Sequence, residues 1–385
     1  DSGLLRLLNG LAGAWVKGGP PERAEWRLDL ENGKGSFRGA LTLRPLTGAT
    51  PAVPAHPAVI ASQVINANAP YPECHASTIV EVAPGQLAAA WFGGTKERHP
   101  DVGIWFARHE NGRWLPAVEV ANGVQPDGTR QPTWNPVLFA PKNAPLQLFY
   151  KVGPSPSKWW GMVITSSDGG RTWSAPRRLP DGILGPVKNK PLELADGTWL
   201  SASSTEGNPT GWRVHFERST DQGATWTKIG PVEKGGGFGY DMIQGSLLRH
   251  ADGRLQSLGR TRNGVTASTW SADGGLTWSP LAPLHVPNTN SGTDAVTLAD
   301  GRHLLVFNDT NPPPERRTKG VRYPIHVALS DDGVTWRTVA TLDVAPHPAG
   351  YAYPAVIQAQ DGRIHITYTC HRDMIKHVVL DPARL

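Results

Sequence analysis

Charged and amide side chains stand near the starts of several apolar runs, and their types suit the binding of an acidic sugar. In GPVKNKPLEL, Lys188 and Lys190 share one face because side chains alternate along a strand. The other polar positions of this kind are Arg130, Asn135, Glu206, Asn288, Asn290 and Asp294. His75 and His99 add proton-transfer chemistry, because imidazole has an ordinary pKa of about 6.5, close to neutral pH.

A recurring phrase indicates the elements that must position these side chains. The copies are SSDGGRTW (166–173), STDQGATW (219–226), SADGGLTW (271–278) and SDDGVTW (330–336). In each copy, Asp can accept hydrogen bonds from its own turn, Gly can take a positive φ, Thr can bond the backbone and Trp can pack beneath. We interpret the phrase as a self-contained hairpin clasp rather than as a calcium or catalytic site.

The spacing of the repeats predicts the fold. The copies start at intervals of 53, 52 and 59 residues, which is the length of one four-stranded sheet. Asp-Gly turns followed by apolar runs lie between them, at 195, 251, 299 and 360, with weaker signals at 83, 111 and 142. The sequence therefore predicts an all-β, six-bladed β-propeller of antiparallel blades over 59–385, with the first blade closed by strands from both termini. Residues 1–58 are predicted to add strands to the propeller or to pack on it.

Composition and charge exclude several classes of protein. The net charge is +5 and the basic residues are scattered, without a nucleic-acid motif, so a small anionic substrate is favoured over nucleic acid. No apolar stretch reaches the length of a membrane span. Cys74 and Cys370 exclude a disulfide-rich scaffold, and they become neighbours if the two chain ends meet. No metal site or cofactor is expected.

The repeated S-x-D-x-G-x-T-W phrase resembles the Asp box, or BNR repeat, of the sialidase-like six-bladed propellers. That resemblance covers most of the chain after residue 60. It implies three arginines that clamp a carboxylate, an Asp acid/base and a Tyr nucleophile activated by Glu. It says little about the reaction, because one fold hosts many activities.

The later elements of the chain match this resemblance. Arg322, before the fourth box, stands where the family has its third arginine, and Arg260 or Arg262 stands where it has the second. Tyr353 lies eight residues before Asp361, as the family's catalytic tyrosine precedes its own turn, and Tyr351 competes with it for the role. The residues expected to bind substrate are Arg130, Asn135, Lys188, Lys190, Glu206, Arg260, Tyr240, Asn290, Asp294 and Tyr351.

The earlier elements depart from it. PYPECHASTIVEV offers His75 where the family has its first arginine, and TKERHPDVG offers His99 at or near the place of the acid/base Asp, with Asp101 two residues on. This pattern resembles the propeller-fold polysaccharide lyases that act on glucuronate. The expected catalytic set is therefore His75, His99, Tyr353, Arg262 and Arg322. In such a β-elimination a cationic group neutralises the carboxylate, and His or Tyr removes the C5 proton.

Other interpretations of the same residues stay open. The two histidines can be loop residues held by a backbone carbonyl, Arg322 can form a structural ion pair, and Tyr353 can be a core aromatic. Residues 372–377, with Arg372, Lys376 and His377, are expected on the surface of the closing blade. An exo-α-sialidase would use Tyr353 as nucleophile, Glu206 or Asp241 behind it and Asp101 as acid, whereas a glycan-binding propeller would perform no reaction.

The substrate expected from this reading is an acidic oligosaccharide or polysaccharide, cleaved by a monomeric protein that is not embedded in a membrane. The sequence starts at Asp1 without an initiator methionine, so we expect a periplasmic or secreted protein and leave a cytoplasmic one open.

Overall fold

The computed structural model describes residues 24–29, 36–41, 56–207, 211–235, 239–310 and 320–385. The chain divides into two compact units, 1–54 and 55–385. In the first, β1 (Ala24–Asp29) pairs antiparallel with β2 (Ser36–Leu41). Most of residues 1–58 lie outside the described residues, so the predicted packing of this extension on the propeller stays a prediction.

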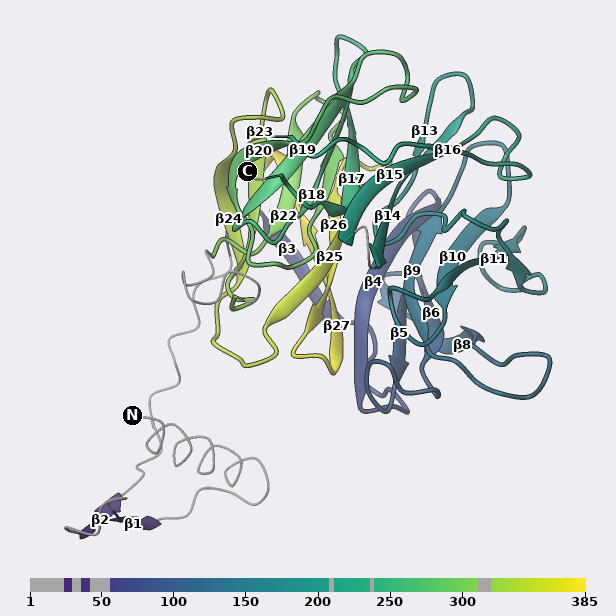
Figure 1. Ribbon diagram of the computed structural model, residues 1–385. Coiled ribbons are helices and arrows are strands. Elements are labelled where there is room, and N and C mark those ends of the chain that lie inside the picture. Colours follow the sequence, from purple (N-terminus) through teal and green to yellow (C-terminus); the bar gives the residue numbers. More distant parts are fainter. Residues whose placement is uncertain (1–23, 30–35, 42–55, 208–210, 236–238, 311–319) are drawn as a thin grey trace. The chain divides into compact units, whose positions relative to one another are not determined.

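The second unit consists of six antiparallel sheets arranged as the blades of a propeller (Figure 1), as the sequence predicts. The first two blades contain β4 (Glu73–Ala83), β5 (Gln86–Gly94), β6 (Gly103–Glu110), β7 (Arg113–Trp114), β8 (Val118–Ala121), β9 (Thr133–Phe139), β10 (Leu146–Val152), β11 (Trp160–Ser166) and β12 (Arg177–Arg178). The next two contain β13 (Leu192–Glu193), β14 (Trp199–Gly207), β15 (Gly211–Ser219), β16 (Thr227–Ile229), β17 (Ile243–Arg249), β18 (Leu255–Arg260), β19 (Val265–Ser271) and β20 (Ala282–Pro287). The last two contain β21 (Asp294–Thr297), β22 (His303–Phe307), β23 (Ile325–Ser330), β24 (Arg337–Asp343), β25 (Tyr351–Gln358), β26 (Ile364–Cys370), β27 (Met374–Leu380) and β3 (Val59–Val64).

The ring closes where the two ends of this unit meet. Strand β3, from the start of the unit, pairs with β27, from its end, and completes the sheet of β25, β26 and β27. A short 3₁₀ helix, η2 (Pro382–Arg384), follows. The blade that both ends of this unit build is therefore the last along the chain, and the prediction that they close the first blade is wrong. In the first blade, β7 and β8 share the outer position, and both pair with β6.

The repeated phrases fall on the hairpins between third and fourth strands. In the first copy, the Asp168 carboxylate accepts hydrogen bonds from Ser166 Oγ at 2.7 Å and Thr172 Oγ1 at 2.6 Å. The backbone N–H groups of Arg171 and Thr172 also donate to it, each at 2.9 Å. These bonds hold the pKa of Asp168 far below its usual range. The predicted clasp is therefore confirmed.

The tryptophan of each phrase extends the clasp to the preceding blade, which the sequence did not indicate. Trp278, in the fourth blade, stacks on Phe216 of the third with ring centres 3.6 Å apart. Trp173 meets Phe106 edge-on across the first blade boundary. There Gly170 has a φ of 87°, and a Cβ on it would lie 2.2 Å from the Phe106 ring, so glycine is needed for the close approach.

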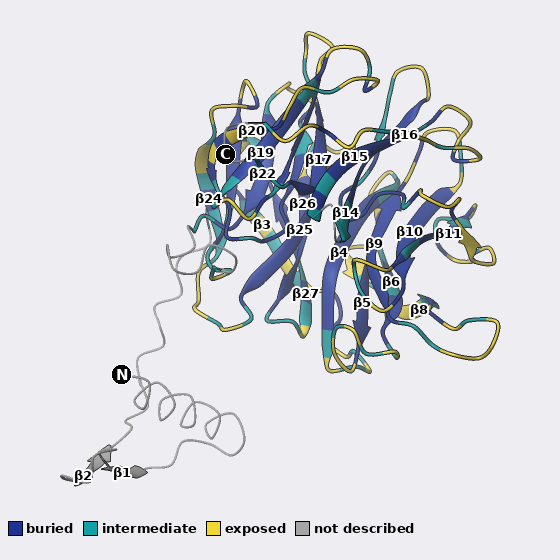
Figure 2. Ribbon diagram, viewed as in Figure 1, coloured by how far each residue is buried: buried dark blue, intermediate teal, exposed yellow. Residues whose placement is uncertain are grey.

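The apolar core clusters join buried residues of neighbouring blades. Buried residues follow the strands, and exposed residues concentrate in the turns (Figure 2). Cys74 on β4 and Cys370 on β26 lie in strands that contact one another, and both thiols are free and buried. Burial raises the pKa of Cys74 to about 12 and that of Cys370 to about 11. The two cysteines therefore pack as small apolar side chains.

Candidate active site

The repeated turns all lie at one end of the propeller, and the candidate site lies at the opposite end. The Asp-Gly turns follow first strands and the Asp boxes follow third strands, so both groups lie at the same end of the antiparallel blades. The loops after second strands lie at the opposite end. A cavity of about 180 Å³ opens there, and every blade contributes to its wall. Its lining residues are His75, Phe92, Glu97, Arg98, Trp134, Asn135, Pro156, Trp159, Glu206, Gln244, Arg260, Arg322, Tyr353 and Arg372.

Bulges in the first strands direct several of these side chains. Ala76, Asn135, Gln244 and Tyr353 have positive φ angles of 57°, 35°, 57° and 53°. At each of these positions the pairing with the next strand shifts register. A bulge of this kind re-aims a side chain, and a strained backbone is concentrated at functional sites. Four blades thus have a β-bulge in their first strand at the cavity.

The hydroxyl of Tyr353 is surrounded by donors. Arg260 Nη1 lies 2.7 Å from it and Gln244 Nε2 lies 3.1 Å from it. Both groups donate to the phenol oxygen. The position behind Tyr353 is therefore occupied by an amide and a guanidinium, where the sialidase resemblance implies a glutamate. An amide cannot take the proton of the phenol.

Four arginines line the cavity, namely Arg98, Arg260, Arg322 and Arg372. Arg260 Nε donates to Asn290 Oδ1 at 2.8 Å, and Arg322 lies over the Tyr353 ring, 5.8 Å from its centre. In the part of the chain that the structure describes, neither Arg260 nor Arg322 forms an ion pair with a carboxylate. Arg372 Nη1 does, 2.7 Å from Glu97 Oε2. Burial lowers the pKa of Arg322 because it disfavours the charged form, and the positive charge of the neighbouring Arg260 lowers it further.

His75 is buried against Tyr353. Its ring centre lies 4.2 Å from the Tyr353 ring, and its Nδ1 lies 2.9 Å from Thr369 Oγ1 on β26. Burial, followed by the charges of Arg372, Arg322, Arg260 and Lys188, holds the pKa of His75 well below its usual range. The imidazole is therefore neutral at physiological pH.

Glu206 supplies a second kind of acid–base group. It lies at the end of β14, and it lines both the central cavity and a neighbouring one. Burial raises the pKa of Glu206, although Arg260 and Arg262 partly oppose the rise. A carboxyl group of this kind can hold a proton closer to neutral pH than an exposed glutamate can.

Of the expected catalytic residues, the structure brings His75, Tyr353 and Arg322 together and places His99 and Arg262 elsewhere. The His99 side chain is 42% exposed in the loop after β5, with Nδ1 2.8 Å from Asp101 Oδ1. Arg262 lies over the Trp212 ring at 4.0 Å, outside the cavity wall. Arg260 takes the inner position because it ends β18, whereas Arg262 belongs to the loop beyond.

Of the expected substrate-binding residues, Asn135, Glu206 and Arg260 line the cavity. Asn290 borders it indirectly, as the acceptor for Arg260. Tyr351 is buried in the core with its hydroxyl on Ala345 O at 3.2 Å, and burial raises its pKa to about 12.

Four other expected residues have structural contacts instead. Lys190 pairs with Asp294 at 2.9 Å, and Asp294 also accepts the Ser246 hydroxyl at 2.9 Å, which joins neighbouring blades. Arg130 Nη2 donates to the Asp101 carbonyl at 2.8 Å. Tyr240 packs on the core between the third and fourth blades.

Lys188 lies buried beneath the cavity rather than in its wall. Its ammonium donates to the carbonyls of Thr293, at 2.9 Å, and Pro354, the residue after Tyr353. It lies 5.9 Å from the centre of the Tyr353 ring. Burial lowers the pKa of Lys188 to about 7, although Asp294 opposes the fall.

Sequence reasoning missed Arg372, which was expected on the blade surface, and also Glu97, Arg98, Gln244 and the aromatic wall. Of the same segment, Lys376 is partly exposed and pairs with Asp343, whereas His377 is buried, so its predicted place on the blade surface is wrong. A signal for Arg372 was available. Its hairpin joins the second and third strands of its blade, as the loops that carry Arg262 and Arg322 do, so all three belong to the same end.

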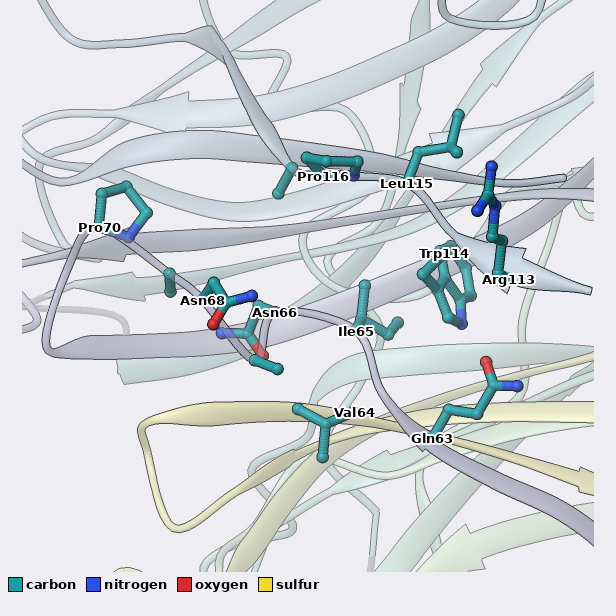
Figure 3. Close-up of a pocket in the computed structure, with 13 residues that line it drawn as sticks. Gln63, Val64, Ile65, Asn66, Asn68, Pro70, Arg113, Trp114, Leu115 and Pro116 are labelled. Carbon is teal, nitrogen blue, oxygen red and sulfur yellow. The ribbon is translucent and has the colours of Figure 1, made fainter.

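A larger cavity, of about 490 Å³, lies between the segment after β3 and the segment that follows β7 (Figure 3). Trp114 and Leu115 line one side, and Ile65 and Asn66 line the other. Among the residues that the structure describes, Arg113 is the one ionisable side chain in its wall. Its size exceeds that of the central cavity, but the groups that can move protons or hold an anion line the central one.

Two further findings concern the described residues alone. No group of three or more His, Cys, Asp or Glu side chains among them is arranged to hold a metal ion. Across the same residues, no helix has the length and apolar character that crossing a membrane requires.

Comparisons with known proteins agree with this fold. Residues 85–366 match the family model described as a BNR repeat-like domain. An anhydrosialidase from Macrobdella decora is 24% identical over 164 residues, or 40% of this chain and 21% of that protein. Xyloglucanase Xgh74A from Acetivibrio thermocellus is 31% identical over 167 residues, or 40% of this chain and 19% of that protein. The chain thus spans about a fifth of the length of the curated relatives it matches.

The structure of the Hadza microbial sialidase Hz136 superimposes with a TM-score of 0.67 and 17% identity, over 82% of this chain and 67% of that one. At this identity the likeness concerns the fold.

Proposed function

Because the chain belongs to the BNR repeat-like domain family of sialidase-like propellers, we propose that it cleaves a glycosidic bond next to a carboxylate-bearing sugar, by β-elimination at a hexuronate such as glucuronate. One observation carries the proposal: four arginines line the same cavity as Tyr353, whose hydroxyl accepts hydrogen bonds from a guanidinium and an amide, and among the described residues no carboxylate bonds to that hydroxyl.

The arginines support the choice of an acidic substrate. Arg260 and Arg322 lack carboxylate partners among the described residues, and they lie close enough for the charge of Arg260 to lower the pKa of Arg322. A substrate carboxylate would relieve that repulsion and accept charge-assisted hydrogen bonds from both. Arg372, which lines the same cavity, is paired with Glu97.

The surroundings of Tyr353 support elimination. A phenolate that accepts hydrogen bonds from Arg260 and Gln244 can take the proton on C5 of a hexuronate. The electrons of that C–H bond form the C4=C5 double bond, the C4–O4 bond breaks, and the leaving oxygen takes a proton. The arginines stabilise the negative charge that builds up on the carboxylate group. Neutral His75, whose ring lies tilted against that of Tyr353, is the second candidate for the base.

Retaining hydrolysis of a sialoside is the second candidate function. Its support is Glu206, a carboxyl group with a raised pKa in the cavity wall, together with the sialidase-type fold. Tyr353 would then attack the anomeric carbon. Against this, burial raises the pKa of Asp101, the acid expected from the sequence, but the hydrogen bonds from Thr95 together with His99 outweigh burial and lower that pKa.

The products separate these reactions. Glucuronate-containing glycans are incubated with the protein while the ultraviolet absorbance of the C4=C5 double bond is followed, and sialosides are assayed for free sialic acid. We expect the absorbance to rise, with a loss of at least 100-fold in Tyr353→Phe. If His75→Gln loses activity and Tyr353→Phe does not, the imidazole is the base. Sialic acid release without unsaturated product would refute elimination, and binding without either product would indicate a glycan-binding propeller.

A further inference from the structure

The central cavity has a neighbour that the proposed reaction does not yet use. A second cavity, of about 380 Å³, is lined by Ser157, Lys158, Glu206 and Gly207. Ser157 and Lys158 come from the loop between β10 and β11, which also supplies Pro156 and Trp159 to the wall of the arginine cavity. The two cavities therefore adjoin over the second and third blades, and Glu206 is the residue that lines both.

Glu206 lies where the bond between the bound sugar and its leaving group is expected to break. A sugar whose carboxylate is held by the arginines fills the first cavity, and the group attached to that sugar must leave through an adjoining space. The bond between the two groups then crosses the boundary between the cavities. Glu206 is at that boundary, whereas Glu97, the other carboxylate of the central cavity, is engaged by Arg372 at 2.7 Å.

From this arrangement, we infer that Glu206 is a catalytic general acid, which protonates the leaving oxygen, and that the Ser157–Lys158 cavity receives the leaving sugar. The inference rests on the proposed function of the arginine cavity. The expected acid of the sequence analysis, His99 or Asp101, lies in an exposed loop and is bonded within that loop. Burial raises the pKa of Glu206, which favours the protonated form that the role requires.

Glu206 gives its proton to the leaving oxygen in elimination and in hydrolysis alike. In elimination, Tyr353 gains the C5 proton, the C4–O4 bond breaks, and the Glu206 carboxyl O–H passes its proton to O4. The departing sugar leaves as a neutral alcohol and Glu206 becomes a carboxylate. Solvent then takes the proton from Tyr353 and returns one to Glu206, which restores the starting state. In hydrolysis, the same carboxyl protonates the glycosidic oxygen as the Tyr353 phenolate attacks the anomeric carbon. Water, deprotonated by the Glu206 carboxylate, then attacks that carbon and breaks its bond to Tyr353, which releases the sugar and restores the phenolate and the Glu206 acid.

The test compares a leaving group that must be protonated as it departs with one that need not be. One hexuronate carries a second sugar on O4 and the other carries 4-nitrophenol on O4, and a matched pair of sialosides covers hydrolysis. Nitrophenolate departs without a proton, whereas a sugar alkoxide needs one. In Glu206→Gln we expect a loss of about 100-fold or more in kcat on the sugar-leaving substrate. On the nitrophenyl substrate the loss should be at least ten times smaller, and the alkaline limb of the pH profile of kcat should disappear.

Glu97→Gln serves as the matched control. It removes a carboxylate from the same cavity, so it should affect both substrates of a pair by the same factor. Equal losses on both substrates in Glu206→Gln would overturn the general-acid role and leave the proposed function standing, because Glu206 would then act in binding. No loss on either substrate would overturn it as well. A wild-type protein that cleaves none of the four substrates would refute the proposed function and this inference together.

Discussion

Replacing Arg322 by methionine removes one charge of the proposed carboxylate clamp and keeps most of the side-chain volume. Arg322 lies 5.8 Å from the centre of the Tyr353 ring and has no carboxylate partner in the described part of the chain. A hydrogen bond to a charged group contributes about 1.5–3 kcal/mol net. Because Arg260 and Arg372 remain, we expect the lower part of that range, about 2 kcal/mol, or roughly 30-fold weaker binding of an acid.

The assay is calorimetric titration of glucuronate and of its neutral methyl ester into the wild type and the variant. The acid should lose about 30-fold in affinity, and the ester should change less than about three-fold, since it lacks the charge that Arg322 would hold. Arg254→Met is the control for net charge, because Arg254 pairs with Asp252 in a turn at the other end of the propeller. The free Arg322→Met protein should be at least as stable as the wild type, since burial and Arg260 disfavour the Arg322 charge.

Two outcomes would refute this reasoning. Equal losses for the acid and for the ester would mean that Arg322 contributes shape rather than charge. Equal losses in Arg322→Met and Arg254→Met would mean that the affinity follows the overall field of a basic protein rather than a clamp.

Three further changes test other parts of the account. Gln244→Glu replaces the amide that donates a hydrogen bond to the Tyr353 hydroxyl, at 3.1 Å, by a carboxylate. The rate of elimination should fall at least ten-fold, because the phenol would keep its proton. A faster reaction would favour hydrolysis. Burial lowers the pKa of His377 to about 3, so between pH 7 and pH 4 this imidazole takes up a proton in the unfolded chain but not in the folded protein, and the free energy of unfolding should fall by about 3 kcal/mol. The thermal midpoint should therefore fall over that interval, and His377→Gln should reduce the fall; equal slopes would contradict this. Asp273→Ala deletes the acceptor of the Asp box, including the Thr277 N–H at 2.9 Å, and should lower the free energy of unfolding by about 2–4 kcal/mol in urea melts; an unchanged midpoint would refute the clasp.

The fold was predictable because the repeats are local signals. Each Asp box folds through hydrogen bonds among residues close in sequence, such as those of Asp168 with Ser166 and Thr172. Its hairpin can therefore be predicted from a few residues, without knowledge of the rest of the chain. What the boxes did not show is the contact between blades. The stacking of Trp278 on Phe216 joins residues 62 positions apart, and no short-range pattern specifies it.

The site was predictable only in part, because its residues meet through topology. Arg260 and Arg262 are equivalent by spacing, and the end of β18 decides between them. Lys188 and Asp294 look like binding residues in a sequence, yet both are buried and bond to the backbone across blades. Gln244 carries no chemical signal by itself. Its role follows from the bulge in β17, which turns its side chain toward Tyr353.

The most direct test of the central claim is a crystal structure of the protein with a hexuronate bound. We expect the sugar carboxylate in the arginine cavity, within hydrogen-bonding distance of Arg260 and Arg322, with C5 facing the Tyr353 hydroxyl. A carboxylate bound in the cavity beside Trp114, or one that points to solvent away from both arginines, would contradict it.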